Sequence, residues 1–211
     1  MDQIDFLAAQ IKTLLKQNAE VIVVDGSSTD ATLEAIKKLG CQFISSPAGR
    51  AKQMNAGARI AKGDVLVFLH ADTGLPEKAL ESITTCIQKC PWGRFDVTLS
   101  GKSFLFRIIE TFMNVRSCFT GIATGDQCIF VTHVLFDECG GFSEIPLMED
   151  IAMSKRLKQF SKPACINDRV ITSSRRWESK GIFRTIVLMW YLRLAYFLGV
   201  SPHRLHKHYY K

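Results

Sequence analysis

Apolar runs that end abruptly in small or polar residues mark the first half of the chain. The three runs are VIVVDGSS at 21–28, CQFISSP at 41–47 and VLVFLHADT at 65–73. Continuous apolar runs of this length are typical of strands that are buried on both faces. In parallel sheets, ligands bind beyond the carboxyl ends of the strands. We therefore expect Asp25 and Asp72, which end two of the runs, to lie at one rim of a sheet.

Helix-like segments separate and follow these runs. Apolar side chains recur at helical spacing over 30–39, over 51–61 and after Pro76, which is typical of a first helical position. Strands alternating with helices predict an α/β protein with a mostly parallel sheet flanked by helices. The second half predicts strands at 93–97 and 126–131, a helix at 106–119, and a loop that feeds a helix starting near Glu149 and Asp150. Because acids are favoured in a first helical turn, stabilisation of the helix start is a purely structural explanation of this acidic pair.

Composition indicates one full core. The chain has 211 residues, of which 47% are hydrophobic and 22% charged. No charged segment followed by an apolar one marks a signal peptide at the start. The seven cysteines have no zinc-type spacing, and Cys86 and Cys90 fit one helical face better as two core thiols than as metal ligands. The simplest compartment is the reducing cytoplasm.

Positive charge is concentrated at the carboxyl end of the chain. Residues 169–211 contain nine Lys or Arg and one acid, Glu178, whereas the other 168 residues contain 18 basic and 19 acidic side chains. The basic end favours an anionic partner such as phosphate groups, a membrane surface or nucleic acid. A solvated tail that aids solubility is the alternative.

The most apolar part of this basic end is GIFRTIVLMWYLRLAYFLGV at 181–200. Arg184 and Arg193 leave eight uncharged residues between them, far fewer than the roughly 20 needed to span a bilayer. Aromatic side chains with flanking basic residues suit a helix lying in the membrane interface. An ordinary core helix that covers the domain is the alternative, and the pattern slightly favours it. The tail from Pro202 contains three histidines without a supporting acid, and is predicted to be a surface tail rather than a metal site.

Five motifs in order resemble those of family 2 glycosyltransferases. They are VVDGSSTDAT, GRAKQMNAGARIAKGDVLVFLHADT, GIATGDQCIFV, GGFSEIPLMEDIAMSKRL and SSRRWESKGIFRT. The resemblance is greatest to a compact bacterial branch with an LHADT strand end, and it covers about residues 7–205. It implies the GT-A fold, a Rossmann-like nucleotide-sugar-binding domain. We expect this catalytic domain at 1–180 and an amphipathic basic helix with its tail at 181–211.

The resemblance assigns roles to residues on the nucleotide side. Asp25, Arg50 and Asn55 match positions that contact the nucleotide. Asp72 matches the last acid of the family's Asp-X-Asp motif, although position 70 is His70 rather than aspartate. Asp72 is therefore expected to bind Mg²⁺ or Mn²⁺ together with diphosphate oxygens. The role of His70 stays open between a metal neighbour and a packed histidine.

The remaining matches concern the transfer of the sugar to the acceptor. Asp150 matches the catalytic base, which removes the proton of the attacking acceptor hydroxyl, and Glu149 matches a supporting acid. Asp126 is interpreted as an acceptor or donor-sugar contact. The motif Arg175-Arg176-Trp177 resembles the Arg-Trp part of a family motif whose glutamine position is Ser173 here. Guanidinium groups suit diphosphate recognition, and an indole can stack on a sugar ring.

One departure from the family concerns the start of the chain. Family members usually begin with a further strand whose end holds the nucleotide base, whereas MDQIDFLAAQIKTLL already reads as the following helix. Either the start is internal to a longer sequence, or part of the base-binding floor is absent. Loss of a central strand would also expose sheet edges.

The leading functional hypothesis is an inverting, metal-dependent glycosyltransferase that uses a nucleotide-diphosphate sugar, with UDP favoured by the resemblance. Its partners would be that donor and a hydroxyl acceptor of lipid or lipid-linked type, met at the cytoplasmic face of a membrane. The alternatives are a catalytically inactive module that binds nucleotide sugars or a membrane surface, and a nucleotidyltransferase. The latter is disfavoured because no Gly-rich basic loop follows a first strand. Nucleic-acid binding is least favoured, because no groove-reading motif is present.

Overall fold

The computed structural model describes residues 3–26, 36 and 38–209. The helix expected at 30–39 lies almost entirely outside the described residues. The first half contains α1 (Gln3–Lys16), β1 (Ile22–Asp25), β2 (Gln42–Ser45), α3 (Arg50–Ile60), β3 (Val65–Phe68), β4 (Thr73–Gly74) and α4 (Ala79–Ile87). The second half contains β5 (Trp92–Leu99), α5 (Phe104–Thr120), η1 (Gly125–Gln127), β6 (Ile129–Thr132), α6 (His133–Glu138), α7 (Glu149–Leu157), β7 (Ala164–Thr172), α8 (Arg175–Lys180), α9 (Ile182–Phe197) and α10 (Pro202–Tyr209).

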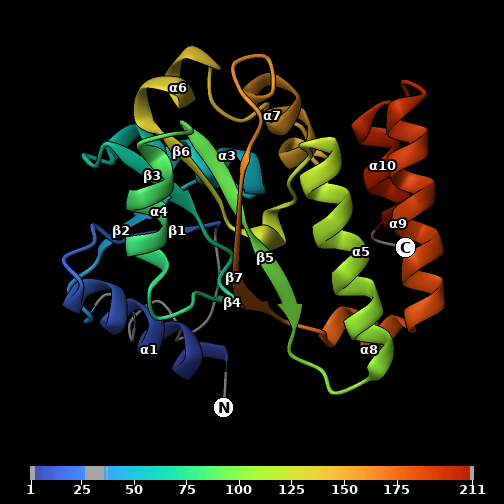
Figure 1. The fold of residues 1–211 in the computed structure, drawn as a ribbon, viewed down its shortest axis with the longest axis horizontal. Coiled ribbons are helices and arrows are strands. Elements are labelled where there is room, and N and C mark those ends of the chain that lie inside the picture. Colours follow the sequence, from blue (N-terminus) through green and yellow to red (C-terminus); the bar gives the residue numbers. More distant parts are fainter. Residues whose placement is uncertain (1–2, 27–35, 37, 210–211) are drawn as a thin grey trace.

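Two sheets organise these elements (Figure 1). The strands β1 and β2 form a parallel pair, and five further strands follow the order β3-β6-β5-β7-β4. Within the five-stranded sheet only β5 and β7 run parallel, and the other three pairings are antiparallel. The predicted α/β class with flanking helices is therefore confirmed, but the sheet is mixed rather than mostly parallel.

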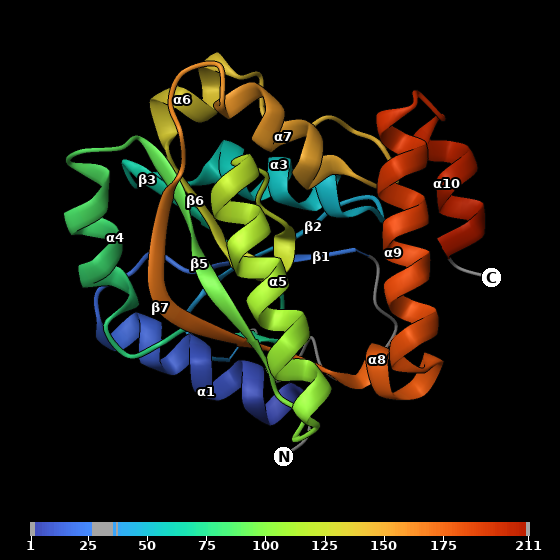
Figure 2. The same cartoon turned by 45° about the vertical axis from the view of Figure 1, so that its right-hand side comes forward.

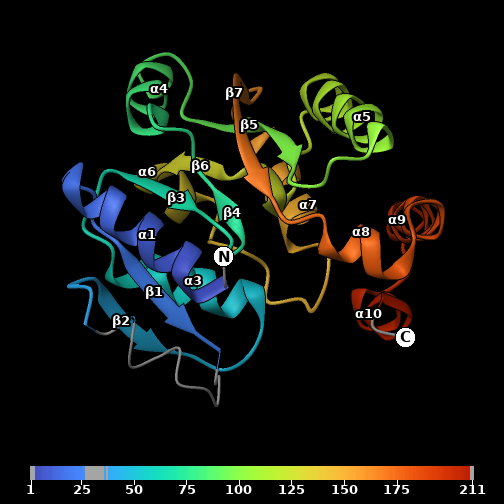
Figure 3. The same cartoon turned by 90° about the horizontal axis from the view of Figure 1, so that it is seen from below.

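The larger sheet is covered on both faces. Figure 3 shows α4 and α5 on one side of it, and α1, α3 and the β1–β2 pair on the other. One core cluster contains Leu66, Trp92, Val131 and Met153, and a second contains Phe95, Val97 and Phe130. Because β5 and β6 supply side chains to both clusters, they are the central strands of the fold.

The carboxyl end of the chain departs from the predicted surface tail. Residues 202–209 form α10, whose Leu205 and Tyr209 are buried against α9 and the start of α7. The segment is a short amphipathic helix, because its apolar residues recur four apart. Its many basic side chains conceal this pattern in the sequence. Figure 2 shows α9 and α10 side by side, next to α7.

Candidate active site

Two acids begin α7, as the sequence predicts. The preceding residue, Met148, has a positive φ of 70°, a conformation uncommon for residues other than glycine, so the loop turns sharply before Glu149. One carboxylate oxygen of Asp150 accepts a hydrogen bond from the backbone N–H of Gly125 at 3.0 Å, and the other accepts from the N–H of Ile151 at 2.7 Å. Two backbone donors therefore fix the orientation of this carboxylate.

Burial dominates the protonation of both acids. It raises the pKa of Asp150, although the bonds from Gly125 and Ile151 act in the opposite direction. Burial likewise raises the pKa of Glu149, whose side chain is only 5% exposed, and the adjacent Asp150 charge raises it further. A carboxylate with a raised pKa is a better proton acceptor than an ordinary one, which suits general-base chemistry.

A small pocket lies in front of these acids. It is lined by His70, Gly125, Glu149 and Asp150 together with Met54, Phe68, Ile129 and Phe142. The ring of His70 packs directly on Gly125, where a Cβ atom would come within 2.5 Å of it. Only glycine leaves room for this contact, so the TGD segment and the end of β3 fit together closely.

His70 and Asp126 form a second polar pair at the site. The Nδ1 atom of His70 lies 3.5 Å from a carboxylate oxygen of Asp126. Burial acts to raise the pKa of Asp126, but the hydrogen bond and charge of His70, with the charges of Arg50 and Arg176, outweigh it and lower the pKa. Asp126 is thus held ionised among three basic side chains.

Helix α3 supplies two of the predicted residues, with different functions. Arg50 begins the helix, and its charge acts to lower the pKa values of Asp126, Glu149 and Asp150, so it lies near these three acids. Asn55 instead binds the main chain of Phe142: its amide donates to the carbonyl at 2.9 Å and accepts from the N–H at 2.8 Å. Asn55 therefore holds the loop that leads to Glu149.

The Arg-Arg-Trp motif divides between the site and the core. Arg176 stacks on the ring of Tyr209, 3.6 Å from its centroid, and donates to the hydroxyl and carbonyl oxygens of that residue. The neighbouring Arg175 donates to the hydroxyl of Ser173 at 3.2 Å, and both arginines line an open hollow along α8. Trp177 packs against an apolar cluster that includes Phe106. Both arginines therefore lie at the hollow, whereas the indole contributes to packing.

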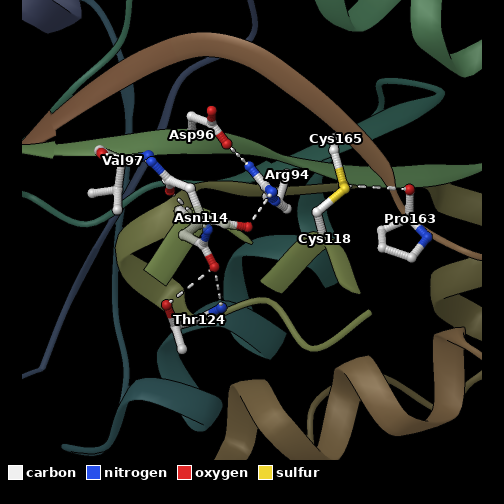
Figure 4. Close-up of polar contacts among 9 residues, drawn as sticks. Arg94, Asp96, Val97, Asn114, Cys118, Thr124, Pro163 and Cys165 are labelled. Carbon is white, nitrogen blue, oxygen red and sulfur yellow. Dashed lines mark hydrogen bonds and ion pairs between the residues drawn. A yellow bond between two sulfur atoms is a disulfide. The ribbon is translucent and has the colours of Figure 1, made fainter. Parts of the chain in front are cut away.

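A buried polar network supports the floor of the site (Figure 4). Asn114 on α5 exchanges two hydrogen bonds with the main chain of Val97, and Arg94 donates to the carbonyl of Asn114 at 2.9 Å. Gln127 in η1 donates to the side chain of Asn114 at 3.4 Å. The network thus links α5 and β5 to the turn that binds Asp150.

Cysteine pairing was not indicated by the sequence. Cys118 at the end of α5 forms a disulfide with Cys165 at the start of β7, with Cα atoms 6.0 Å apart (Figure 4). The pair is 47 residues apart and has no motif, so spacing could not reveal it. Disulfides are rare in a reducing cytoplasm, so the expected compartment stays a prediction.

Two residues near the acids were also missed by sequence analysis. Arg116 on α5 is largely buried; burial lowers its pKa, and the charge of Asp150 acts in the opposite direction. Tyr209, which positions Arg176, follows a run of basic residues. Neither residue belongs to a recognisable motif, so no local signal could have identified them.

The two strand-end acids do not share a sheet. Asp25 ends β1 in the two-stranded sheet and is 8% exposed, whereas Asp72 lies in the turn between β3 and β4 of the larger sheet. Within the described ranges, no three His, Cys, Asp or Glu side chains converge to hold a metal ion. Asp72 fits as one oxygen ligand of a hard cation, but the remaining ligands would have to come from a bound substrate.

The acids Glu149 and Asp150 thus line a small pocket at the start of α7 in an α/β fold. The model of the family Glycosyl transferase family 2 matches residues 2–131. The chain belongs to this family. A search of curated protein sequences finds no match.

Solved structures support the fold. Residues 1–349 of TarS from S. aureus share 16% identity with a TM-score of 0.59, covering 82% of this chain and 58% of that one. The mannosyltransferase PcManGT from Pyrobaculum calidifontis, in complex with GDP-Man and Mn²⁺, shares 17% identity with a TM-score of 0.59, covering 80% and 53%. A mycobacterial protein shares 13% identity with a TM-score of 0.53, covering 82% and 62%. The chain thus has the GT-A fold and spans less than two thirds of the length of each of these structures.

Proposed function

We propose that this chain is an inverting, metal-dependent hexosyltransferase. It would transfer a sugar from a nucleotide-diphosphate sugar, with UDP favoured, to the hydroxyl of a lipid or lipid-linked acceptor at the cytoplasmic face of a membrane. The observation that carries the proposal is the carboxylate of Asp150, which lines the pocket, is oriented by the N–H of Gly125 and has a raised pKa.

The arrangement suggests a role for each group. Asp150 would accept the proton of the acceptor hydroxyl as its oxygen attacks the anomeric carbon, opposite the leaving diphosphate. Buried Glu149 would support the base, while Arg50 and Arg176 would balance the negative charge of the diphosphate. A divalent cation bound by Asp72 and diphosphate oxygens would supply further neutralisation of the leaving group.

Related structures support the donor class. TarS has been solved with UDP-GlcNAc and with UDP, and PcManGT with GDP-Man and Mn²⁺. The remaining predicted nucleotide contact, Asp25, ends a strand, as such contacts do in α/β sheets. A nucleotide-diphosphate sugar and a divalent cation are therefore the ligands to test first.

The test compares donor binding with donor turnover in the variant Asp150→Asn. This change keeps the shape of the side chain but removes the base, so we expect UDP release from a panel of UDP-sugars, measured with a bacterial lipid extract as the acceptor source, to fall by about 10²–10⁴-fold. Donor binding should persist. Asp137→Asn on α6, where the aspartate side chain is 72% exposed, is the matched control and should keep wild-type turnover. Donor binding without turnover by the wild-type chain would instead favour the inactive binding module.

A further inference from the structure

Exposed apolar side chains are concentrated on two helices. Thirteen of the seventeen large apolar side chains exposed within the described ranges lie on α5 or on α9 and its final cap residue. We call them the α5–α9 surface: Phe104, Leu105, Ile108, Phe112, Val115, Phe119, Phe183, Val187, Trp190, Tyr191, Leu194, Phe197 and Leu198. Monomeric soluble proteins rarely expose contiguous apolar patches beyond roughly a few hundred Å², so such a surface indicates a partner.

The exposed residues form one stripe on each helix. On α5 the sequence positions advance by four, four, three and four from Phe104 to Phe119, and on α9 by four, three and four from Phe183 to Leu194. These steps keep side chains on one face of a helix. The opposite faces are occupied, because α5 covers β5 and α9 packs on α7 and α10.

The two stripes belong to neighbouring helices. Phe106 and Ile109 on α5 share an apolar cluster with Ile182 and Ile186 on α9. Figures 1 and 3 show α5 and α9 at the same side of the molecule, away from the β1–β2 pair. The exposed stripes therefore flank one interhelical contact.

Charge on these helices has a single sign at the surface. The one acid within α5 and α9 is Glu110, which is 2% exposed and bound to the N–H of Leu99 and to Arg107. Exposed basic side chains on the same two helices accompany the stripes, namely Arg107 and Arg184. An apolar face with basic and no exposed acidic side chains is complementary to an anionic lipid surface.

We propose that the α5–α9 surface docks the protein on an anionic membrane, with both helices lying in the interface. None of the helices in the described part of the chain is long and apolar enough to cross a bilayer. Trp190 and Tyr191, 73% and 52% exposed, are the residue types that favour the headgroup region. Association through two helical faces at once provides more buried apolar area than one helix alone.

The surface is close to the catalytic acids. On the inner side of α9, Leu192 and Ala195 pack in one cluster with Met148 and Ile151, the residues that flank Glu149 and Asp150. One helix diameter, about 10 Å, therefore separates the apolar face from the start of α7. Docking would hold the site beside the membrane. This consequence for the acceptor rests on the proposed function, but the docking itself does not.

The test is sedimentation of the full chain with vesicles of phosphatidylcholine alone or with added phosphatidylglycerol. We expect binding to the anionic vesicles, weakened by salt, with a blue shift of Trp190 fluorescence that Trp190→Phe removes. Phe112→Asp and Trp190→Asp should each lower the partition ratio about tenfold or more, because a carboxylate at the centre of the apolar face is costly. Val134→Asp, at a 70% exposed site on α6, is the matched control and should bind like the wild type.

Three outcomes would overturn the proposal. The first is that the folded wild-type chain does not bind anionic vesicles, and the second is that Val134→Asp and Phe112→Asp lose vesicle binding equally. The third is a stable dimer in analytical ultracentrifugation that Phe112→Asp dissociates, with no binding to vesicles. The last result would assign the surface to a second copy of the chain. Circular dichroism of each variant establishes that it is folded. Because sedimentation needs no turnover, failure of docking and failure of sugar transfer are separate results.

Discussion

The side-chain amide of Asn55 binds both main-chain polar groups of Phe142, donating at 2.9 Å and accepting at 2.8 Å. This pair joins α3 to the loop that ends at Met148, immediately before Glu149 and Asp150. An asparagine that resembles a nucleotide contact in the sequence thus has a positioning function in the fold. The site depends on a loop fixed by a helix far away in sequence.

Substitution Asn55→Ala should destabilise the protein and loosen this loop. Losing two hydrogen bonds to partly buried main-chain groups is expected to lower the free energy of unfolding by about 2 kcal/mol, measured by urea denaturation. Exposed Lys52→Ala on the same helix is the control and should change it by no more than about 0.5 kcal/mol. Weaker nucleotide binding at unchanged stability would contradict the positioning role and favour direct nucleotide contact.

Glu149→Gln should stabilise the protein at neutral pH. Burial and the neighbouring Asp150 raise the pKa of Glu149, so folding favours its protonated form, and stability is lost as pH rises through the raised pKa. Glutamine cannot ionise, so the variant should have the higher melting temperature at pH 7, with the difference vanishing near pH 4. Each unit of pKa difference corresponds to about 1.4 kcal/mol. Exposed Glu144→Gln is the control for net charge, and a lower melting temperature for Glu149→Gln at pH 7 would refute the argument.

Asp126→Asn should have the opposite pH dependence. Burial acts to raise the pKa of Asp126, but the hydrogen bond and charge of His70 are the main causes that lower it overall. The ionised form of Asp126 therefore stabilises the fold above the unfolded pKa of about 3.9. The loss of stability in the variant should therefore be present at pH 6 and disappear as pH falls through the folded pKa. In a His70→Ala background the same change should cost much less. Equal effects in both backgrounds would show that the pair is not coupled.

Reduction of the Cys118–Cys165 disulfide should lower stability. A cross-link that closes a 47-residue loop contributes about 3–4 kcal/mol in the chain-entropy account. We expect this loss on treatment with dithiothreitol and in Cys118→Ser, and a non-reduced intact mass lighter by two hydrogens than the reduced one. Cys86→Ser on α4 is the control, because Cys86 is a free thiol. Identical urea midpoints with and without reductant would contradict the prediction.

Local motifs identified segments that the fold brings together, while the roles of their residues stay predictions. Glu149, Asp150 and Asp126 come together as the sequence suggests, because each lies in a short segment whose conformation is set by nearby residues. Trp177 could not be placed in this way, since an indole serves equally in an apolar cluster and on a sugar.

Strand pairing shows why part of the fold escaped prediction. The strand β7 contains Asp168 and Arg169 between apolar residues, and only three of its nine residues are buried. Such a segment resembles a loop in isolation. Its pairing with β5 and β4 depends on partners up to 99 residues away, which no local pattern reports. The same long-range pairing separates Asp25 from Asp72, which one parallel sheet would have brought together.

The most direct test of the central proposal is a thermal-shift screen of the purified chain against UDP, GDP, dTDP and their common sugars, with and without Mn²⁺. A ligand that binds only the folded state raises the melting temperature by mass action. At a ligand concentration a hundredfold above Kd, the free energy of unfolding increases by about 2.7 kcal/mol. The account predicts a shift with one nucleotide that needs Mn²⁺ and is lost in Asp72→Ala. The absence of a shift with every nucleotide, on a protein that melts cooperatively, would contradict it.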